Sequence, residues 1–193
     1  NDTTKKWAQA VPVPGGVNSE QHDANLSISP DGGTMFLYMN DPKTGGDIYY
    51  SKVSSTGRWR SPRPLEKPIN TDYFESYASQ TADGNYLYFC SERAKDGPFE
   101  KIGFGNGDIY MAEKTGRREY AKPKNLGPII NTEEDEISVF IHPDGKTLFF
   151  SSKGHKGMGG YDIFMSKKQQ DGTWSEPQNM GYPINTIYDD KDF

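Results

Sequence analysis

The chain contains 193 residues, of which 33% are hydrophobic and 13% are aromatic, and it includes 21 glycines and 13 prolines. Such a composition favours many short strands over helices, and no stretch shows the i, i+3, i+4, i+7 apolar spacing of an amphipathic helix. The net charge of −5 argues against a nucleic-acid binder, which needs a basic face, and no apolar run approaches the roughly 20 residues of a membrane-spanning helix.

A strand motif recurs three times along the chain. Its copies read GDIYYSK, GDIYMAE and YDIFMSK and begin at residues 46, 107 and 161. In every copy the aspartate precedes an asparagine by 23 residues, in the pairs Asp47 and Asn70, Asp108 and Asn131, and Asp162 and Asn185. An Asp-Gly turn follows 13 residues after each of Asn18, Asn70 and Asn131. Fixed spacings of this kind indicate a repeat architecture.

Each repeat predicts four strands in the same order. The first is an apolar run before the Asp-Gly turn, which is a strong hairpin signal. The second is a nearly continuous apolar run, typical of a strand that is covered on both faces. The third is the Asp-Ile strand, and the fourth contains Pro62, Pro123 or Pro177 and is therefore expected at an edge. In chain order the first strands are 25–29, 76–80 and 137–141, and the second strands are 34–39, 86–91 and 147–152.

Four antiparallel strands per repeat are typical of a β-propeller blade. The successive repeats occupy residues 19–70, 71–131 and 132–185, while residues 1–18 correspond to the outer strand of a preceding blade and 186–193 to the start of a further one. The sequence therefore predicts an all-β propeller with three complete blades and a partial blade at each end. Because propellers close with roughly four to eight blades, we expect completion by further blades of a longer chain or by self-association.

The third repeat carries the most specific family signal. Residues 151–186, SSKGHKGMGGYDIFMSKKQQDGTWSEPQNMGYPINT, resemble the propeller repeats of OmpA-family (PorE-like) envelope lipoproteins of Bacteroidota, and the SPDG and HPDG turns resemble TolB-type, WD-like repeats. In that OmpA family a tetratricopeptide segment, a propeller and a peptidoglycan-binding domain share one chain, and a type IX secretion component has this architecture. The resemblance implies a non-enzymatic scaffold for protein partners of the cell envelope, located in the periplasm beside the outer membrane or exported. It assigns peptidoglycan binding to no residue of this sequence.

One loop per repeat varies in length, and it lies between the second and third strands. Rigid scaffolds with one variable loop per repeat commonly place recognition there, and residues 91–108 form the longest such loop. We therefore predict a partner-binding loop face that includes Arg93, Lys95, Phe99, Phe104, Lys153 and His155.

A carboxylate follows each repeat asparagine by five residues: Asp23, Glu75, Glu136 and Asp190. These acids are expected near the start of the innermost strands, around a central channel. One interpretation is a glycan hydrolase or carbohydrate-binding propeller that uses them, and another is a structural cation in the channel. The preferred interpretation is that each acid accepts hydrogen bonds from its surroundings, since it recurs in every blade whereas catalysis needs carboxylates in unlike environments.

Other candidate residues are interpreted as structural. The aspartates of the Asp-Ile strands are expected to accept loop N–H groups, as aspartate does in turns. Trp59, Tyr120 and Trp174 share one repeat position and are expected to pack between blades, and Cys90 occupies a buried strand position. The loops do not match the calcium-binding pattern D-x-[DN]-x-[DN]-G, so no metal or cofactor is assigned. The sequence thus predicts a binding scaffold and not an enzyme.

Overall fold

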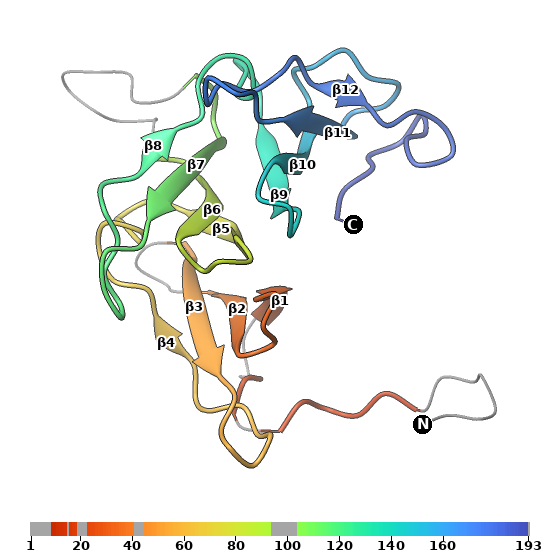
Figure 1. Ribbon diagram of the computed structural model, residues 1–193. Coiled ribbons are helices and arrows are strands. Elements are labelled where there is room, and N and C mark those ends of the chain that lie inside the picture. Colours follow the sequence, from red (N-terminus) through yellow and green to blue (C-terminus); the bar gives the residue numbers. More distant parts are fainter. Residues whose placement is uncertain (1–8, 15, 19–22, 41–44, 94–103, 193) are drawn as a thin grey trace.

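The structure is a computed structural model that describes residues 9–14, 16–18, 23–40, 45–93 and 104–192 (Figure 1). The described residues form three four-stranded antiparallel sheets and no helix. The first sheet contains β1 (Asp23–Ile28), β2 (Thr34–Met39), β3 (Asp47–Lys52) and β4 (Arg63–Pro64). The second contains β5 (Glu75–Gln80), β6 (Tyr86–Ser91), β7 (Asp108–Glu113) and β8 (Lys124–Asn125). The third contains β9 (Glu136–Ile141), β10 (Thr147–Ser152), β11 (Asp162–Lys167) and β12 (Gln178–Asn179).

The strands lie in chain order within each sheet, which confirms the predicted all-β fold of four-stranded blades. The fourth strand is shorter than expected, with two residues per blade, and each aligned proline lies just before it. The chain already pairs with the third strand before the proline, since the Arg60 N–H donates to the Lys52 carbonyl at 3.0 Å. A proline has no N–H to donate, so it interrupts this pairing, which resumes after Pro62, Pro123 or Pro177.

A buried asparagine ends each blade and binds the start of that blade's third strand. The side-chain oxygen of Asn131 accepts the backbone N–H of Ile109 at 2.8 Å, and its amide nitrogen donates to the Ile109 carbonyl at 3.0 Å. Asn70 and Asn185 make the same pair of bonds in the other two blades. The constant spacing seen in the sequence therefore records one two-sided contact, which we call the asparagine clamp.

Each inner strand contains a register shift near its third residue. Tyr77 and Ser138 lie two residues after Glu75 and Glu136 and adopt φ angles of 45° and 54°, which non-glycine residues rarely do. Asp192, two residues after Asp190, repeats this geometry with a φ of 60°. The Ser138 hydroxyl also donates to an Asp192 carboxylate oxygen at 2.8 Å. Residues 186–192 thus follow the path that leads into an inner strand, although they form no strand.

The core lies between blades. One cluster joins the first and second sheets and includes Phe36, Ile48, Leu87 and Tyr110, and a second joins the second and third sheets and includes Tyr88, Ile109, Ile141 and Phe150. The Trp174 ring meets Tyr88 of the preceding blade edge-on, with 6.2 Å between ring centroids. This contact confirms the packing between blades that was predicted for Trp174.

Figure 1 shows the three blades fanned around one side, with β1, β5 and β9 innermost and the fourth strands outermost. Residues 9–14 and 16–18 form no strand, and the assignment of residues 1–18 to the outer strand of a preceding blade stays a prediction. In each blade the fourth strand pairs with the third strand of the same blade. Among the described residues, no third strand precedes residues 9–18 that could pair with them. Instead, Val17 is buried against Met35 and Leu37 on the free face of the first blade.

Candidate functional site

Two of the predicted channel carboxylates are buried and bound within their own blade. Glu75 and Glu136 are 0% exposed. Glu75 accepts the backbone N–H of Thr71 at 2.8 Å, the Thr71 hydroxyl at 2.6 Å and the Ser91 hydroxyl at 2.8 Å. Glu136 accepts the same three groups from Thr132 and Ser152. Both side chains therefore connect the segment that leads into an inner strand to the second strand, and they do not face an open channel.

The remaining two acids differ in what the structure describes. Asp190 accepts the backbone N–H and the hydroxyl of Thr186, as the two glutamates do with their threonines. Asp23 begins β1, and its side chain lies outside the described part of the molecule.

The burial of the two glutamates changes their pKa values. Burial raises the pKa of Glu75, and it raises the pKa of Glu136 to about 7, although the hydrogen bonds to each carboxylate act to lower it.

Arg93 and His155 were predicted on the partner-binding loop face, but both side chains turn inward. The Arg93 guanidinium donates to the Pro68 carbonyl at 3.0 Å and lies 5.0 Å from the ring centroids of Phe89 and Tyr110. Its side chain is only 10% exposed and lies 3.4 Å from the Glu75 carboxylate. This corrects its predicted role, because a guanidinium occupied by carbonyls, rings and a buried acid is not presented to a partner.

His155 occupies the corresponding place in the third blade. Its Nε2 lies 2.9 Å from the Ile130 carbonyl, and its ring packs on Phe150 and Phe164 at centroid distances of 5.8 and 5.3 Å. Because a carbonyl oxygen only accepts, Nε2 carries the proton in this contact. The GHKGMGG loop of residues 154–160 is therefore anchored at the third blade by its histidine.

The variable loops of the second and third blades pack on the next segment of chain. The Asp108 carboxylate accepts the N–H groups of Phe104 and Gly105, and Asp162 accepts those of Met158 and Gly159, as predicted for these aspartates. A Cβ added to Gly105 would lie 1.9 Å from the Glu134 carbonyl oxygen.

Gly159 approaches the Tyr188 carbonyl equally closely, at 1.8 Å from an added Cβ. The glycine three residues before each of these aspartates thus allows the loop to lie directly on the segment leading into the following blade. We call this contact the inter-blade latch. Its glycines and aspartates have a structural role, because they hold the loop against that segment.

Of the other predicted loop-face residues, Phe104 and Lys153 remain accessible. Phe104 is 45% exposed. The Lys153 ammonium lies 3.3 Å from the Asp135 carboxylate and 4.6 Å from the centre of the Tyr161 ring. Lys95 and Phe99 lie outside the described residues.

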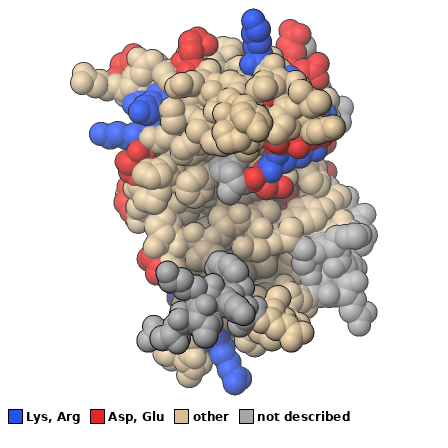
Figure 2. Space-filling view, turned by 90° about the vertical axis from the view of Figure 1, so that its right-hand side faces the viewer, with Lys and Arg blue, Asp and Glu red and all other residues tan. Residues whose placement is uncertain are grey.

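A hollow of about 640 Å³ lies where the three inner strands meet. It is lined by Ala24, Asn25, Leu26, Ser27, Tyr38, Phe74, Ser76, Tyr77, Ser138, Val139, Phe140 and Asp192. Asp192 is the one carboxylate in this lining, so Glu75, Glu136 and Asp190 do not line the hollow. Figure 2 views the molecule from this side, where a group of acidic and basic side chains lies near the centre and mostly uncharged surface lies below it.

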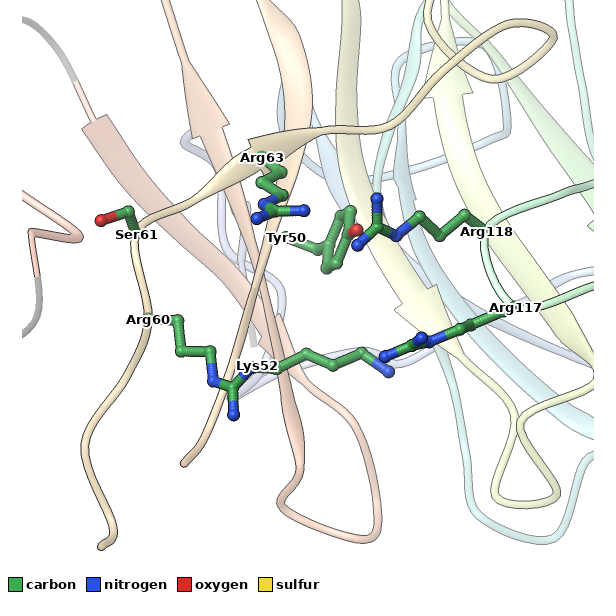
Figure 3. A pocket seen from close by; sticks show the side chains of 7 residues that line it. All are labelled: Tyr50, Lys52, Arg60, Ser61, Arg63, Arg117 and Arg118. Atoms are coloured by element: carbon green, nitrogen blue, oxygen red, sulfur yellow. The ribbon is translucent and has the colours of Figure 1, made fainter. Parts of the chain in front are cut away.

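Sequence reasoning missed a basic pocket between the first and second blades. This hollow of about 310 Å³ is lined by Tyr50, Lys52, Arg60, Ser61, Arg63, Arg117 and Arg118 (Figure 3). The signal that could have found it is the basic content of two corresponding turns, TGRWRSPR at 56–63 and TGRRE at 115–119. A linear sequence does not show that these turns face each other across a blade boundary.

Metal and thiol chemistry find little support in the described residues. No group of three or more His, Cys, Asp or Glu side chains among them is arranged to hold a metal ion. Cys90 is 3% exposed, and burial raises the pKa of its thiol. No helix in the described part of the chain is long and apolar enough to cross a membrane.

Comparison with known proteins supports the fold. No protein-family profile and no curated protein matches the sequence. Among solved structures, TolB from Acinetobacter baumannii aligns with a TM-score of 0.53 and 16% identity over 87% of this chain and 34% of TolB. The tricorn protease aligns with a TM-score of 0.47 and 11% identity over 80% of this chain and 18% of its own, and an ancestral GH74 enzyme with 0.45 and 14% over 82% and 19%. The chain thus spans about a third of the length of TolB, and this alignment identifies its sheets as propeller blades.

Proposed function

We propose that this chain is a non-enzymatic propeller scaffold that mediates protein or cell-envelope interactions. It would belong to a larger periplasmic, outer-membrane-associated or secretion-system protein of the OmpA-family type of Bacteroidota. The observation that carries the proposal is an uncovered apolar face on the third blade. A surface of this kind is typical of a protein interaction site, because apolar side chains gain free energy when a partner removes them from water.

The exposed apolar residues that make up this surface lie on the strand β9, where Phe140 packs on the Phe149 ring, and on the chain after β12. Val139 and Ile141 are buried against the second blade, so Phe140, which alternates with them, points the other way and is 37% exposed. Beyond β12, Ile187 and Tyr188 are 72% and 73% exposed. In the proposed function, further blades or another copy of this chain cover these residues.

Light scattering of the purified chain over a range of concentrations tests this use of the apolar face. We expect a mass above 21.7 kDa that rises with concentration. The double variant Ile187→Asp/Tyr188→Asp should lower this mass toward the monomer, because a charge at each position cannot be buried without a partner. Ile28→Asp is the matched control, since Ile28 is 49% exposed at the end of β1, in the first blade. A chain that stays monomeric at every concentration contradicts completion by a second copy.

A screen of chromogenic glycosides tests the non-enzymatic assignment. We expect no turnover above background, because Glu75 and Glu136 are buried and hydrogen-bonded. If hydrolysis is found, Asp192→Asn should be compared with the exposed control Glu133→Gln. Activity lost only with Asp192 would overturn the assignment and place a reaction in the central hollow.

The accessible loop residues give a separate test of partner binding. The amount of envelope protein that is cross-linked to the immobilised chain should decrease in the variant Phe104→Ala/Lys153→Ala. It should stay at the wild-type level in the control Lys122→Ala, which replaces an exposed residue. Equal capture by both variants would remove Phe104 and Lys153 from the binding face.

A further inference from the structure

The basic pocket gathers five cationic side chains from two blades. Lys52 ends β3, Arg60 lies between β3 and β4, and Arg63 begins β4. Arg117 and Arg118 come from the turn between β7 and β8. Figure 3 shows the side chains of both blades extending across the blade boundary toward one another. All five residues are exposed, so they contribute little to the core.

These cations form no close ion pairs within the described part of the chain. No Asp or Glu of this part lines the pocket. Glu66 lines an adjoining hollow that shares Arg63 and Arg118 with it. Asp31 interacts electrostatically with Lys52, but five cations around one hollow repel each other, and these acids offset only part of that repulsion.

Arginine is suited to one ligand chemistry in particular. Its planar guanidinium donates two parallel hydrogen bonds to phosphate or carboxylate oxygens, and four of the five cations here are arginines. A single phosphate carries at most about two negative charges near neutral pH, so it would leave most of the positive charge uncompensated. The half-buried ring of Tyr50 adds an apolar surface beside Arg63 and Arg118.

We propose that this pocket binds a compact polyanion with at least two phosphate groups, either free in solution or as the headgroup of a lipid. The site lies on the side of the blades that carries the Asp-Gly turns, because β3 and β7 end there, whereas the variable loops lie at the opposite ends of the same strands. The proposal is therefore independent of the partner-binding loop face.

Calorimetric titration with pyrophosphate and with inorganic phosphate tests the soluble form of the ligand. We expect saturable binding of pyrophosphate that is at least about tenfold tighter than that of phosphate and that weakens as salt increases. Co-sedimentation with phosphatidylcholine vesicles that contain diphosphoryl or monophosphoryl lipid A tests the headgroup form, for which we expect binding only to the diphosphoryl vesicles.

Single-charge variants separate a built site from general electrostatic attraction. Arg63→Ala and Arg118→Ala should each weaken binding of the preferred probe by about tenfold, as expected for the loss of one charge-assisted hydrogen bond. The control Arg58→Ala removes the same charge from an exposed residue outside the pocket and should change binding less than about twofold. The proposal is overturned if neither probe binds, if one phosphate binds as well as two, or if all three variants weaken binding equally.

Discussion

An Arg93 guanidinium nitrogen lies 3.4 Å from a Glu75 carboxylate oxygen, and both side chains are removed from water. The third blade repeats the acid as Glu136, but it has His155 in the place of the arginine, and that histidine binds a carbonyl group instead. Two blades with the same backbone thus hold the same buried acid in different electrostatic environments.

Replacement of Arg93 should reveal the cost of leaving Glu75 without its cation. Removal of one partner from a buried ion pair typically destabilises a protein by about 3 kcal/mol or more. We expect Arg93→Met to lower the free energy of unfolding by this amount in urea denaturation, and Arg93→Met/Glu75→Gln to recover part of the loss. Arg58→Met, at an exposed position, should have little effect. An Arg93→Met protein as stable as the wild type would show that the hydroxyl and N–H donors around Glu75 suffice.

The pH dependence of stability should depend on Glu136. Its pKa of about 7 in the folded chain exceeds the ordinary value of 4.5, so the folded state binds an extra proton between these two pH values. Stability from this group is therefore fully present below pH 4.5 and decreases as the pH rises to about 7, by about 3 kcal/mol in total. Glu136→Gln should flatten the decline in unfolding free energy between pH 5 and pH 8. If the unfolding free energies of the wild type and of Glu136→Gln change with pH in the same way, the raised pKa of Glu136 is contradicted.

The loop of the inter-blade latch should tolerate a methyl group at Gly107 but not at Gly105. In Gly105→Ala the new Cβ would lie 1.9 Å from the Glu134 carbonyl oxygen, whereas in Gly107→Ala it would lie 3.5 Å from the Glu136 carbonyl oxygen, an ordinary contact. We expect Gly105→Ala to lower the melting temperature by several degrees, and Gly107→Ala to leave it close to the wild-type value. A similar melting temperature for both variants would show that the loop moves away without loss of stability.

The asparagine clamp should make a large contribution to stability. Asn131→Ala would leave the buried N–H of Ile109 without its partner, whereas the Ile109 carbonyl keeps the Leu126 N–H at 3.1 Å, so the cost is about 1–3 kcal/mol. Urea denaturation should therefore show a loss of about 2 kcal/mol. The exposed Asn106→Ala should differ from the wild type by less than about 0.5 kcal/mol. An equal effect of both substitutions would argue that water replaces the clamp.

Labelling of Cys90 should report on the opening of the second and third blades. The thiol is the only one in the chain and lies in the cluster between these blades. Because burial excludes reagents and raises the thiol pKa, we expect a thiol reagent to react at least about a thousandfold more slowly with the native chain than with the urea-unfolded chain. Rapid reaction in the native state would show that the blades separate readily.

The fold could be predicted from the sequence because the three repeats can be aligned with one another, so that shared residues and spacings stand out. The spacing from Asp108 to Asn131 marks a contact that every blade needs, so it survives in all three copies. The candidate site was less predictable. Arg93 and His155 lie in loops of unequal length, and their inward direction depends on rings and carbonyls contributed by distant strands. The basic pocket escaped detection because Arg63 and Arg118 meet only when two blades pack together.

The asparagine clamp also determines where the chain can change length. Asn131 reaches back across β7 and β8 to Ile109, so a deletion of even one residue between them would pull the side chain away from the groups it binds. The loop between β2 and β3, or between β6 and β7, lies outside that interval, and its length differs from blade to blade. Foreign peptides inserted into these loops should be displayed without loss of the fold, whereas the same insertion between β7 and β8 should prevent the blade from closing.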